Sequence, residues 1–385
     1  MLRTVADANV PFAEAAFGGL GPVTALPGHA ITRAALRGAD VLVVRSVTRV
    51  DGALLDGTPV RFVGSATAGV DHVDVDGLRQ RGVAFASAPG SNAASVADYV
   101  LAALLAVAAD RGEALAGRTL GVVGIGEVGG RLVPRARALG LDVVACDPPR
   151  AAAGDDVDRH DLAETLHLSD VVTVHTPLTR PGESRWPTLG LIGAAALAEM
   201  RPGAWLVNTA RGDVLDGPAV LDARRSGRLG ALVLDVWPGE PTPDPALVVA
   251  ADLATPHVAG YAADAKVRGT AVIADALAAW AASQGEPVAA WEPPPAPEVV
   301  VGAPTGDLGS AAWLDALARQ AVDVRADDGR FRAALDGAAG EARAAAFARL
   351  RRRYPTRHEM SRHSVRGVVP AALAGAVAGG LGMRV

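Results

Sequence analysis

A glycine-rich turn at residues 121–130 restricts the fold more than any other feature of the sequence. Gly124, Gly126 and Gly129 form a G-x-G-x-x-G pattern between an apolar run, typical of a short buried strand, and a helical stretch. Such glycines allow a tight turn, close approach of a pyrophosphate and close packing of helix on strand, while the helix N-terminus favours the phosphate charge. The next apolar strand ends at Asp147, about 20 residues further on, where an acid is expected to bind the ribose 2′-hydroxyl of a dinucleotide. The sequence therefore predicts a dinucleotide-binding domain.

The residues that follow this second strand bear on the choice of cofactor. Asp147 would repel a 2′-phosphate, which favours NAD over NADP. Arg150 lies three residues later and could meet such a phosphate, so NADP is the alternative. We expect NAD.

Length and composition limit the class of protein. A chain of 385 residues exceeds one ordinary hydrophobic core, so two or three domains are expected. A net charge of −5 gives no sign of a nucleic-acid-binding surface. Cys146 is the only cysteine and the N-terminus lacks a basic-then-apolar signal, so we expect a cytoplasmic protein. The apolar runs 96–109 and 368–383 are too short to cross a membrane. The histidines show no metal-ligand spacing, and no metal site is predicted.

Apolar runs and helical stretches alternate along the first two thirds of the chain. The expected strands are 1–5, 40–45, 59–64, 83–86, 170–175, 204–208, 229–236 and 254–257, and the expected helices are 31–37, 93–109 and 262–283. This alternation predicts βαβ units and parallel sheets, with ligands beyond the carboxyl ends of the strands. A proline-rich segment at 291–298 predicts a semi-rigid linker. Beyond it, helical patterns at 311–321 and 341–353 and an arginine cluster at 351–353 indicate a small third unit.

Three side chains at consecutive expected strand ends fit the oxidation of a 2-hydroxy acid. This reaction needs a cation for the carboxylate, a base for the hydroxyl proton and a group that fixes the base. Arg211 suits the first task because guanidinium matches carboxylate bidentately. His257 suits the second because histidine ordinarily titrates near neutral pH, and Glu240 could fix its tautomer. Each residue alone is typical of a loop or surface position, but together in one dinucleotide domain they predict an active site.

These motifs together resemble the D-isomer-specific 2-hydroxyacid dehydrogenases. The matching stretches are 124–129 with Asp147, 65–74, 208–213, 234–241 and 255–260. The resemblance implies two doubly wound parallel-sheet lobes, namely a flavodoxin-like substrate-binding lobe at 1–93 and 258–285 and a Rossmann NAD-binding lobe at 94–257. It also implies that Arg211 binds the substrate carboxylate, and that His257 is the acid/base with Glu240 as its partner.

Within this family the chain is similar to members that oxidise 4-phospho-D-erythronate in vitamin B6 synthesis. The similar stretches are 45–48, 146–150, 257–261, 268–270 and the C-terminal segment. By matching position, the resemblance implies that Ser46, Thr67 and Tyr261 contact the substrate. It implies that NAD is held by the three glycines together with Asp147, Thr176, Asp235 and Gly260, with Asp235 on the nicotinamide carboxamide. It further implies that residues 286–385 form a small α+β dimerisation domain, so we expect a homodimer.

A phosphorylated substrate needs cations, and Lys266 is the only lysine in the sequence. Arg45 and one arginine of the 351–353 cluster, from the same chain or the partner subunit, are predicted to bind the phosphate. Two alternatives remain open. One is another enzyme of the family, such as a 3-phosphoglycerate dehydrogenase, and the other is an NAD-sensing scaffold like the co-repressors that share this fold.

Overall fold

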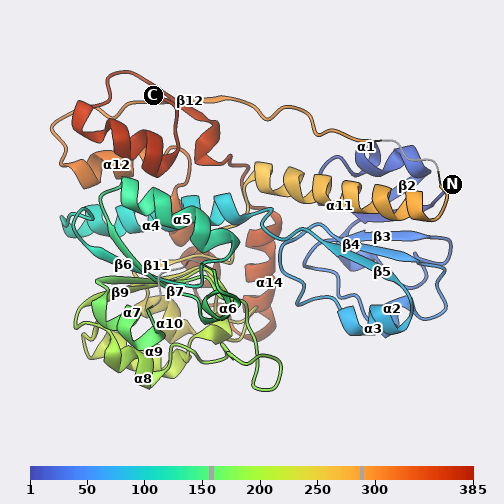
Figure 1. Cartoon of the computed structure of the whole chain (residues 1–385), viewed down its shortest axis with the longest axis horizontal. Coiled ribbons are helices and arrows are strands. Elements are labelled where there is room, and N and C mark those ends of the chain that lie inside the picture. Colours follow the sequence, from blue (N-terminus) through green and yellow to red (C-terminus); the bar gives the residue numbers. More distant parts are fainter. Residues whose placement is uncertain (156–159, 287–289) are drawn as a thin grey trace. The chain divides into compact units, whose positions relative to one another are not determined.

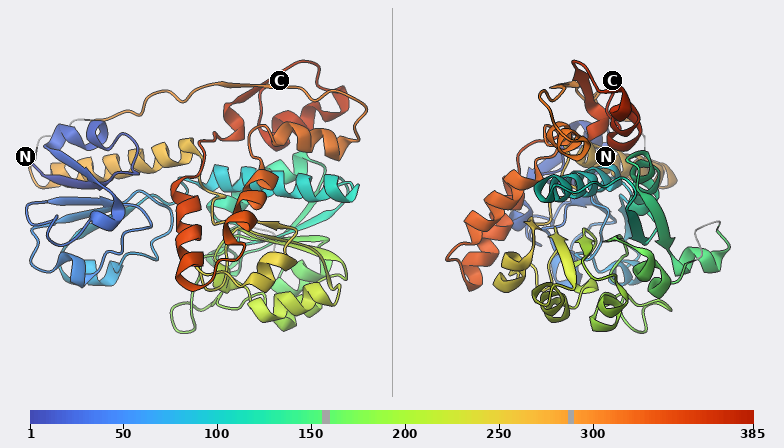
Figure 2. Two further views of the ribbon diagram at one scale, coloured as in Figure 1. Left: turned by 180° about the vertical axis from the view of Figure 1, so that it is seen from behind. Right: turned by 90° about the vertical axis from the view of Figure 1, so that its left-hand side faces the viewer.

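The computed structural model describes residues 1–155, 160–286 and 290–385, and these residues form two compact units. The first unit comprises residues 1–93 and 261–297, and the second comprises residues 94–260 and 298–385. Each unit is built on its own parallel sheet with helices on both faces (Figures 1 and 2). The predicted fold class, two doubly wound lobes with a small α+β segment at the C-terminus, is confirmed.

The first unit holds a five-stranded parallel sheet in the order β2-β1-β3-β4-β5. Its strands are β1 (Thr4–Asp7), β2 (Val23–Leu26), β3 (Val41–Val44), β4 (Phe62–Ser65) and β5 (Ala84–Ser87), and its helices are α1 (Ala13–Phe17), α2 (Gly52–Leu55), α3 (Val75–Gln80) and α11 (Ala263–Ser283). Successive side chains of a strand point to opposite faces, so each face of the sheet has its own core. Helices α1 and α11 cover one face, and α2 and α3 cover the other (Figure 1).

Two details of this unit differ from the sequence-based expectation. Strand β2 was not predicted, because its four residues lie at the sheet edge between two prolines and carry little hydrophobic pattern. Two of them are exposed and two are half-buried. The helix predicted over 31–37 is wrong, since residues 33–38 form turns. There the N–H of Leu36 bonds to the carbonyls of Thr32 and Arg33, and the helical pattern does not continue. A single helical turn carries the full cost of nucleation and gains few hydrogen bonds in return.

The second unit holds a six-stranded parallel sheet in the order β11-β10-β9-β8-β6-β7. Its strands are β6 (Thr119–Val123), β7 (Asp142–Cys146), β8 (Val171–Val174), β9 (Ala204–Asn208), β10 (Leu229–Leu234) and β11 (Leu253–Ala254). One face is covered by α4 (Ala93–Arg111) and α5 (Glu127–Ala138), and the other by α7 (Leu162–Leu168), α8 (Ala194–Glu199), α9 (Gly217–Arg225) and α10 (Pro245–Ala250) (Figure 1). The strand order reverses between β6 and β8, and parallel sheets bind ligands beyond the carboxyl ends of strands at such a point.

Helix α4 is the most apolar long helix of the chain. Among the described helices it is the one long and apolar enough to cross a membrane, and most of it is buried within the protein. Tyr99, Leu101 and Leu104 are fully buried in the core it shares with the six-stranded sheet. Its apolar composition is therefore that of a core helix.

The C-terminal segment packs on the six-stranded sheet and its helices. It contains the parallel strand pair β12 (Val299–Gly302) and β13 (His363–Arg366), with α12 (Ser310–Ala318), α13 (Val324–Leu335) and α14 (Gly340–Arg352). Trp313 and Leu317 of α12 join the core around α4. Phe331 of α13 packs on Trp237, with ring centroids 5.5 Å apart. The two predicted helices of this segment are confirmed, and α13 lies between them. The three-domain scheme, with its limits at 93, 257 and 285, stays a prediction.

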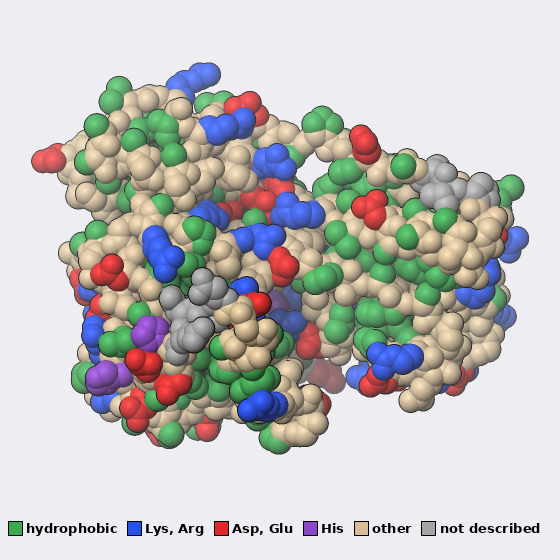
Figure 3. All heavy atoms as spheres, in the orientation of Figure 1, with side chains coloured by type: hydrophobic (Ala, Val, Ile, Leu, Met, Phe, Trp, Pro, Cys, Tyr) green, Lys and Arg blue, Asp and Glu red, His purple; other side chains and the backbone are tan. Residues whose placement is uncertain are grey.

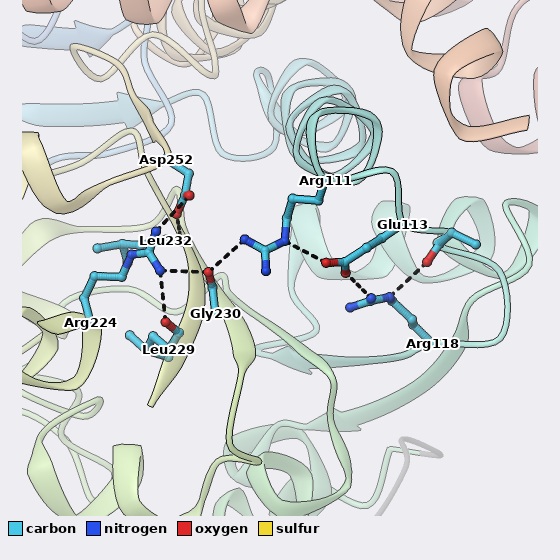
Figure 4. A network of polar contacts seen from close by, with 9 residues as sticks. Arg111, Glu113, Arg118, Arg224, Leu229, Gly230, Leu232 and Asp252 are labelled. Atoms are coloured by element: carbon cyan, nitrogen blue, oxygen red, sulfur yellow. Dashed lines mark hydrogen bonds and ion pairs between the residues drawn. The ribbon is translucent and has the colours of Figure 1, made fainter. Parts of the chain in front are cut away.

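Arginines make hydrogen bonds and ring contacts at the amino-terminal ends of the strands of the second sheet (Figure 4). Arg111 at the end of α4 and Arg224 of α9 donate to the Gly230 carbonyl at 3.2 and 2.8 Å. The guanidinium of Arg118 lies 4.6 Å from the centre of the Trp205 ring. These arginines therefore serve packing and backbone hydrogen bonding. On the face drawn in Figure 3, basic side chains lie among acidic ones.

Candidate active site

The glycine-rich turn joins β6 to α5, and each of its glycines has a separate steric role. Gly124 has a φ of +94°, and a Cβ there would lie 2.9 Å from the carbonyl oxygen of His175. A Cβ on Gly129 would lie 2.2 Å from the carbonyl oxygen of Gly124, so no larger residue allows the helix to approach the turn this closely. Gly126 caps α5, is exposed, and has open space at its Cβ position. The turn thus leaves room beside a helix N-terminus, as a pyrophosphate requires.

Asp147 directly follows β7, where the ribose-binding acid was expected, and its carboxylate also binds the backbone of the glycine-rich turn. Its carboxylate accepts hydrogen bonds from the N–H of Ile125 at 2.8 Å and of Arg150 at 3.1 Å. The Arg150 guanidinium donates to the Ile125 carbonyl and to Asp155, each at 2.7 Å. Arg150 is therefore already engaged by acceptors of the protein, and this arrangement disfavours a 2′-phosphate.

His175 and Thr176 follow β8 beside the turn. The Thr176 hydroxyl is buried and has no hydrogen-bond partner within the part of the chain that the structure describes. A buried hydroxyl without a partner is costly, so its position suits an atom of a bound cofactor. Burial lowers the pKa of His175 to about 3, and the neutral ring hydrogen-bonds with the Thr173 hydroxyl at 3.0 Å. The open turn and the unpaired hydroxyl together fit NAD.

Asp235, at the end of β10, organises the loop that carries His257. The φ of His257 is +58°, a left-handed conformation that strains a non-glycine residue. Its N–H donates to the Asp235 carbonyl at 2.6 Å. The Asp235 carboxylate is buried and accepts hydrogen bonds from the N–H of Val258 and Ala259 at 2.8 and 2.9 Å and from the Thr255 hydroxyl at 2.6 Å. A carboxylate offers about four acceptor positions, so Asp235 keeps capacity for a further donor.

His257 and Glu240 form a hydrogen-bonded pair in this part of the second unit. The His257 Nδ1 lies 2.8 Å from Glu240 Oε2, and Glu240 Oε1 accepts from the Trp237 N–H at 2.9 Å. Burial by itself would raise the pKa of Glu240, but His257, the Trp237 N–H and the nearby Arg351 together lower it. The ionised carboxylate fixes the proton of His257 on Nδ1 and leaves Nε2 as an acceptor. The His257 side chain is 30% exposed, so its ring is accessible.

Arg211 follows β9 and is half-buried. Its backbone carbonyl accepts from the Asn208 side-chain amide at 2.9 Å, and its guanidinium donates to the Ala210 carbonyl at 2.8 Å. Gly212 lies so close to the backbone of Trp237 that a Cβ on it would be 1.9 Å from the Trp237 carbonyl. This approach fixes the Arg211 turn against the loop that carries Glu240. The loops after β9 and β10 are therefore packed together, and hydrogen bonds to Asp235 hold the loop after β11 beside them. Gly260 also belongs to the loop after β11.

The first unit carries its own predicted site residues after β3 and β4. The Arg45 guanidinium donates to the Ala66 carbonyl at 3.1 Å, which links the two strand ends. Ser46 is exposed beside it. The Thr67 hydroxyl lies 2.8 Å from the Ser65 hydroxyl.

Tyr261 precedes α11 in the same unit and is half-buried. The Lys266 ammonium lies 5.2 Å from the centre of its ring, a cation–π distance. The structure thus gathers Arg45, Ser46 and Thr67 at neighbouring strand ends and places Tyr261 at the start of the helix.

The described side chains form no metal-ligand group, and their one thiol is buried. Within residues 1–155, 160–286 and 290–385, no three His, Cys, Asp or Glu side chains gather as metal ligands do. Cys146 is buried at the end of β7, and burial together with Asp147 raises the pKa of its thiol to about 11. This thiol is protonated at neutral pH.

Two residues that touch the site were not predicted from the sequence. Trp237 donates its backbone N–H to Glu240 and its indole N–H to the Thr255 carbonyl at 2.9 Å. It lies inside the motif at 234–241, which was a usable signal. Arg357 of the C-terminal segment donates to the Ala259 carbonyl, 98 residues away in sequence, and no local pattern indicates that contact.

Comparison with known proteins agrees with this geometry. Residues 99–259 match the family model described as D-isomer specific 2-hydroxyacid dehydrogenase, NAD binding domain, and residues 295–375 match a domain of unknown function, DUF3410. Erythronate-4-phosphate dehydrogenase of Salinibacter ruber is 51% identical, over 100% of this chain and 99% of that protein. The enzyme of the same name from Azotobacter vinelandii is 48% identical over 95% of each chain. The solved structure of the TT0316 protein from Thermus thermophilus gives a TM-score of 0.63 at 28% identity, covering 74% of this chain and 98% of that one.

The fold, the glycine-rich turn and the matched family model together define an NAD-dependent dehydrogenase. The chain belongs to the D-isomer specific 2-hydroxyacid dehydrogenase family, among relatives named erythronate-4-phosphate dehydrogenase. The family and the cofactor predicted from the sequence motifs are thereby confirmed.

Proposed function

We propose that the chain oxidises 4-phospho-D-erythronate with NAD⁺, giving (R)-3-hydroxy-2-oxo-4-phosphooxybutanoate and NADH. Relatives named for this substrate share 44–51% of their residues with the chain over nearly its whole length. The observation that carries the chemistry is the 2.8 Å contact between His257 Nδ1 and Glu240 Oε2 on the strained loop after β11. The family resemblance assigns the reaction to pyridoxal 5′-phosphate synthesis.

His257 acts as the base and Glu240 as the group that orients it. NAD⁺, when bound, would supply the acceptor for the hydride on C2 of the substrate. The Nε2 of His257 takes the proton of the C2 hydroxyl, and the ring becomes an imidazolium. The Glu240 carboxylate keeps Nδ1 protonated and stabilises the positive charge as it forms. The lowered pKa of Glu240 keeps this carboxylate ionised throughout the neutral range.

Arginines hold the two anionic ends of the substrate. Arg211 binds the carboxylate through its planar guanidinium. Arg45 and Arg351 bind the phosphate. Within the 351–353 cluster, Arg351 is half-buried and lies close enough to Glu240 for its charge to lower that pKa, whereas Arg352 and Arg353 are exposed. By matching position in the family, further substrate contacts come from Ser46, Thr67 and Tyr261.

The second unit holds the cofactor through residues already placed around the turn. The open space at Gly126 would receive the pyrophosphate, and Asp147 would bind the ribose hydroxyls. The unpaired Thr176 hydroxyl and the spare acceptor position of Asp235 would accept further hydrogen bonds, the latter from the nicotinamide carboxamide. Gly260 completes the set on the loop of His257.

We also propose that the protein is a cytoplasmic homodimer joined through its C-terminal segment. The dimerisation module that the family resemblance implies at residues 286–385 supports the dimer, and the single buried cysteine fits a reducing compartment. Sedimentation analysis is expected to give twice the chain mass of 39.0 kDa. A single-chain mass at micromolar concentration would contradict the dimer.

The test of the substrate is a side-by-side assay of 4-phosphoerythronate and 3-phosphoglycerate, each with NAD⁺ and NADP⁺. NADH formation is followed by absorbance, with hydrazine present to trap the oxo product. The highest kcat/KM is expected for 4-phosphoerythronate with NAD⁺. Preference for 3-phosphoglycerate would overturn the substrate, and preference for NADP⁺ would overturn the cofactor. Binding of NAD⁺ without turnover of either acid would favour a scaffold.

A further inference from the structure

Arg357 lies in the part of the chain that matches a domain of unknown function, yet it reaches the loop of His257. Its side chain is buried, with 9% exposed. Its Nη2 donates to the Ala259 carbonyl and to the Ser95 hydroxyl at 3.1 Å, with a longer contact of 3.4 Å to the Val258 carbonyl. A residue of the C-terminal segment thus contacts both residues that directly follow His257.

Hydrogen bonds hold this loop from two sides. The N–H groups of Val258 and Ala259 donate to the Asp235 carboxylate. The Ala259 carbonyl accepts from Arg357 and from the Ser95 hydroxyl of α4, the latter at 3.0 Å. The left-handed backbone of His257 directly precedes these residues. A strained conformation persists only when its surroundings over-determine it, and Arg357 supplies one of the two sides.

Buried acids balance the charge of Arg357. Burial raises the pKa of Asp98 on α4 and of Asp327 on α13, and the positive charge of Arg357 acts against that rise in both. Asp98 also accepts from the Met360 N–H at 2.8 Å and pairs with Arg135 at 2.7 Å. Through Nη2 the guanidinium is held by the Ala259 carbonyl and by Ser95 of helix α4, whereas its Nε and Nη1 have no hydrogen-bond partner within the described part of the chain.

We propose that the C-terminal segment positions the catalytic loop through Arg357, which acts as a positioning residue for His257. This inference rests on the proposed function, because it takes His257 as the acid/base. Without the guanidinium, the carbonyl side of the loop loses its charged donor, and the His257 ring no longer keeps one orientation toward the substrate. Misplacement of a reacting group by about 1 Å can lower a rate by about 10²-fold. Binding of NAD, which rests mainly on the glycine-rich turn and Asp147, is expected to change less than kcat.

Arg332 provides a matched control for Arg357. It is also an arginine of the C-terminal segment that donates to two backbone carbonyls of the second unit, those of Val248 at 2.6 Å and Ala251 at 2.8 Å. Those carbonyls lie at the end of α10, and Arg332 also pairs with Asp328, whose carboxylate accepts from the Ala254 N–H of β11 at 2.7 Å. Arg332→Ala therefore removes an equivalent tie between the same parts without touching residues 257–260.

The experiment compares Arg357→Ala, Arg357→Lys and Arg332→Ala in the full chain by steady-state kinetics and by hydrogen exchange. Arg357→Ala is expected to lower kcat by about 10–100-fold, with a much smaller change in KM for NAD⁺. Added guanidinium is expected to restore part of that loss, and Arg357→Lys to retain more activity than the alanine variant. Exchange of the Val258 and Ala259 amides is expected to accelerate in Arg357→Ala, while amides of β6 keep their rates.

Three results would overturn the positioning role. They are an unchanged kcat and loop exchange in Arg357→Ala, an equal loss of kcat in Arg332→Ala, or faster exchange spread evenly over the whole second unit. If Arg357→Ala does not fold, Arg357→Lys and Arg357→Gln are measured in its place. Wild-type kcat and wild-type loop exchange in both of these variants would refute the proposal. The exchange readout needs no turnover. Failure of wild-type activity would thus refute the proposed function, while unchanged loop exchange would refute the role of Arg357.

Discussion

Replacing Glu240 with glutamine separates the charge of this side chain from its shape. In the wild type, one carboxylate oxygen faces the Nδ1 of His257 at 2.8 Å and the other accepts from the Trp237 N–H at 2.9 Å. A glutamine has a single acceptor oxygen, so it can satisfy only one of these two donors. If that oxygen serves Trp237, the amide N–H₂ faces His257 and selects the tautomer with the proton on Nε2. That tautomer cannot accept the hydroxyl proton.

The size of the effect follows from these two contacts. A hydrogen bond to a charged group contributes about 1.5–3 kcal/mol, so losing the carboxylate beside the forming imidazolium lowers the rate by about 10–150-fold. A histidine base held in the wrong tautomer loses up to about 10⁴-fold. We therefore expect kcat of Glu240→Gln to fall by about 10²–10⁴-fold, within the range for loss of general acid–base catalysis.

The assay is NADH formation at saturating substrate and NAD⁺, with NAD⁺ affinity measured separately. Glu199→Gln is the control, because Glu199 is an exposed acid at the end of α8 in the same unit. It should keep wild-type kcat. The pKa of Glu240 is lowered by folding, so its carboxylate stabilises the fold above pH 4.5, its ordinary value, and this contribution is lost as pH falls through the lower folded pKa. A Glu240→Gln variant with more than half of wild-type kcat would refute the role of the pair.

Three further predictions concern the cofactor turn, pH and the substrate. Gly129→Ala puts a Cβ 2.2 Å from the Gly124 carbonyl oxygen. The overpacking costs about 1–3 kcal/mol and should raise the NAD⁺ dissociation constant, measured by calorimetry, about 5–150-fold. An unchanged dissociation constant would contradict this steric role of Gly129. Burial lowers the pKa of His175 from 6.5 to about 3, so the unfolded chain binds this proton first and stability falls as pH drops below 6.5. The loss is about 2 kcal/mol at about pH 5, and urea titrations of His175→Gln should lack it, whereas an equally steep slope in the variant would exclude this group. Arg45→Ala should raise KM for the phosphorylated substrate about tenfold or more, as expected for loss of a charge-assisted contact, and leave KM for NAD⁺ unchanged; an unaltered substrate KM would remove Arg45 from phosphate binding.

The parts of the fold that the sequence predicts are those with a repeated local signal. Strands β6, β8, β9 and β10 of the second unit are largely buried, mostly apolar runs, and the turn at Gly124–Gly129 directly follows β6. Strand β2 escaped prediction because an exposed edge strand of four residues carries no such run. The helix expected at 31–37 was wrong for the opposite reason. Its helical sequence pattern is present, but the segment is too short to offset the free-energy cost of helix nucleation.

The site residues divide in the same way. Gly126, Asp147 and Glu240 lie in short motifs whose spacing indicates a function, so the sequence alone is enough to select them. The contact of Arg357 with Ala259 could not be selected in this way, because it joins residues 98 positions apart through tertiary packing alone. The left-handed backbone of His257 is equally invisible in sequence, since no glycine marks that position.

The measurement that tests the central claim most directly is kcat of His257→Ala with 4-phosphoerythronate and NAD⁺, beside the NAD⁺ dissociation constant of the same variant. Loss of the general acid/base is predicted to lower kcat by about 10²–10⁴-fold. The dissociation constant should stay within about twofold of the wild type, because the turn at Gly124–Gly129 and Asp147 remains intact. A kcat within about tenfold of the wild type would mean that another group takes the proton, and it would contradict the account of this site.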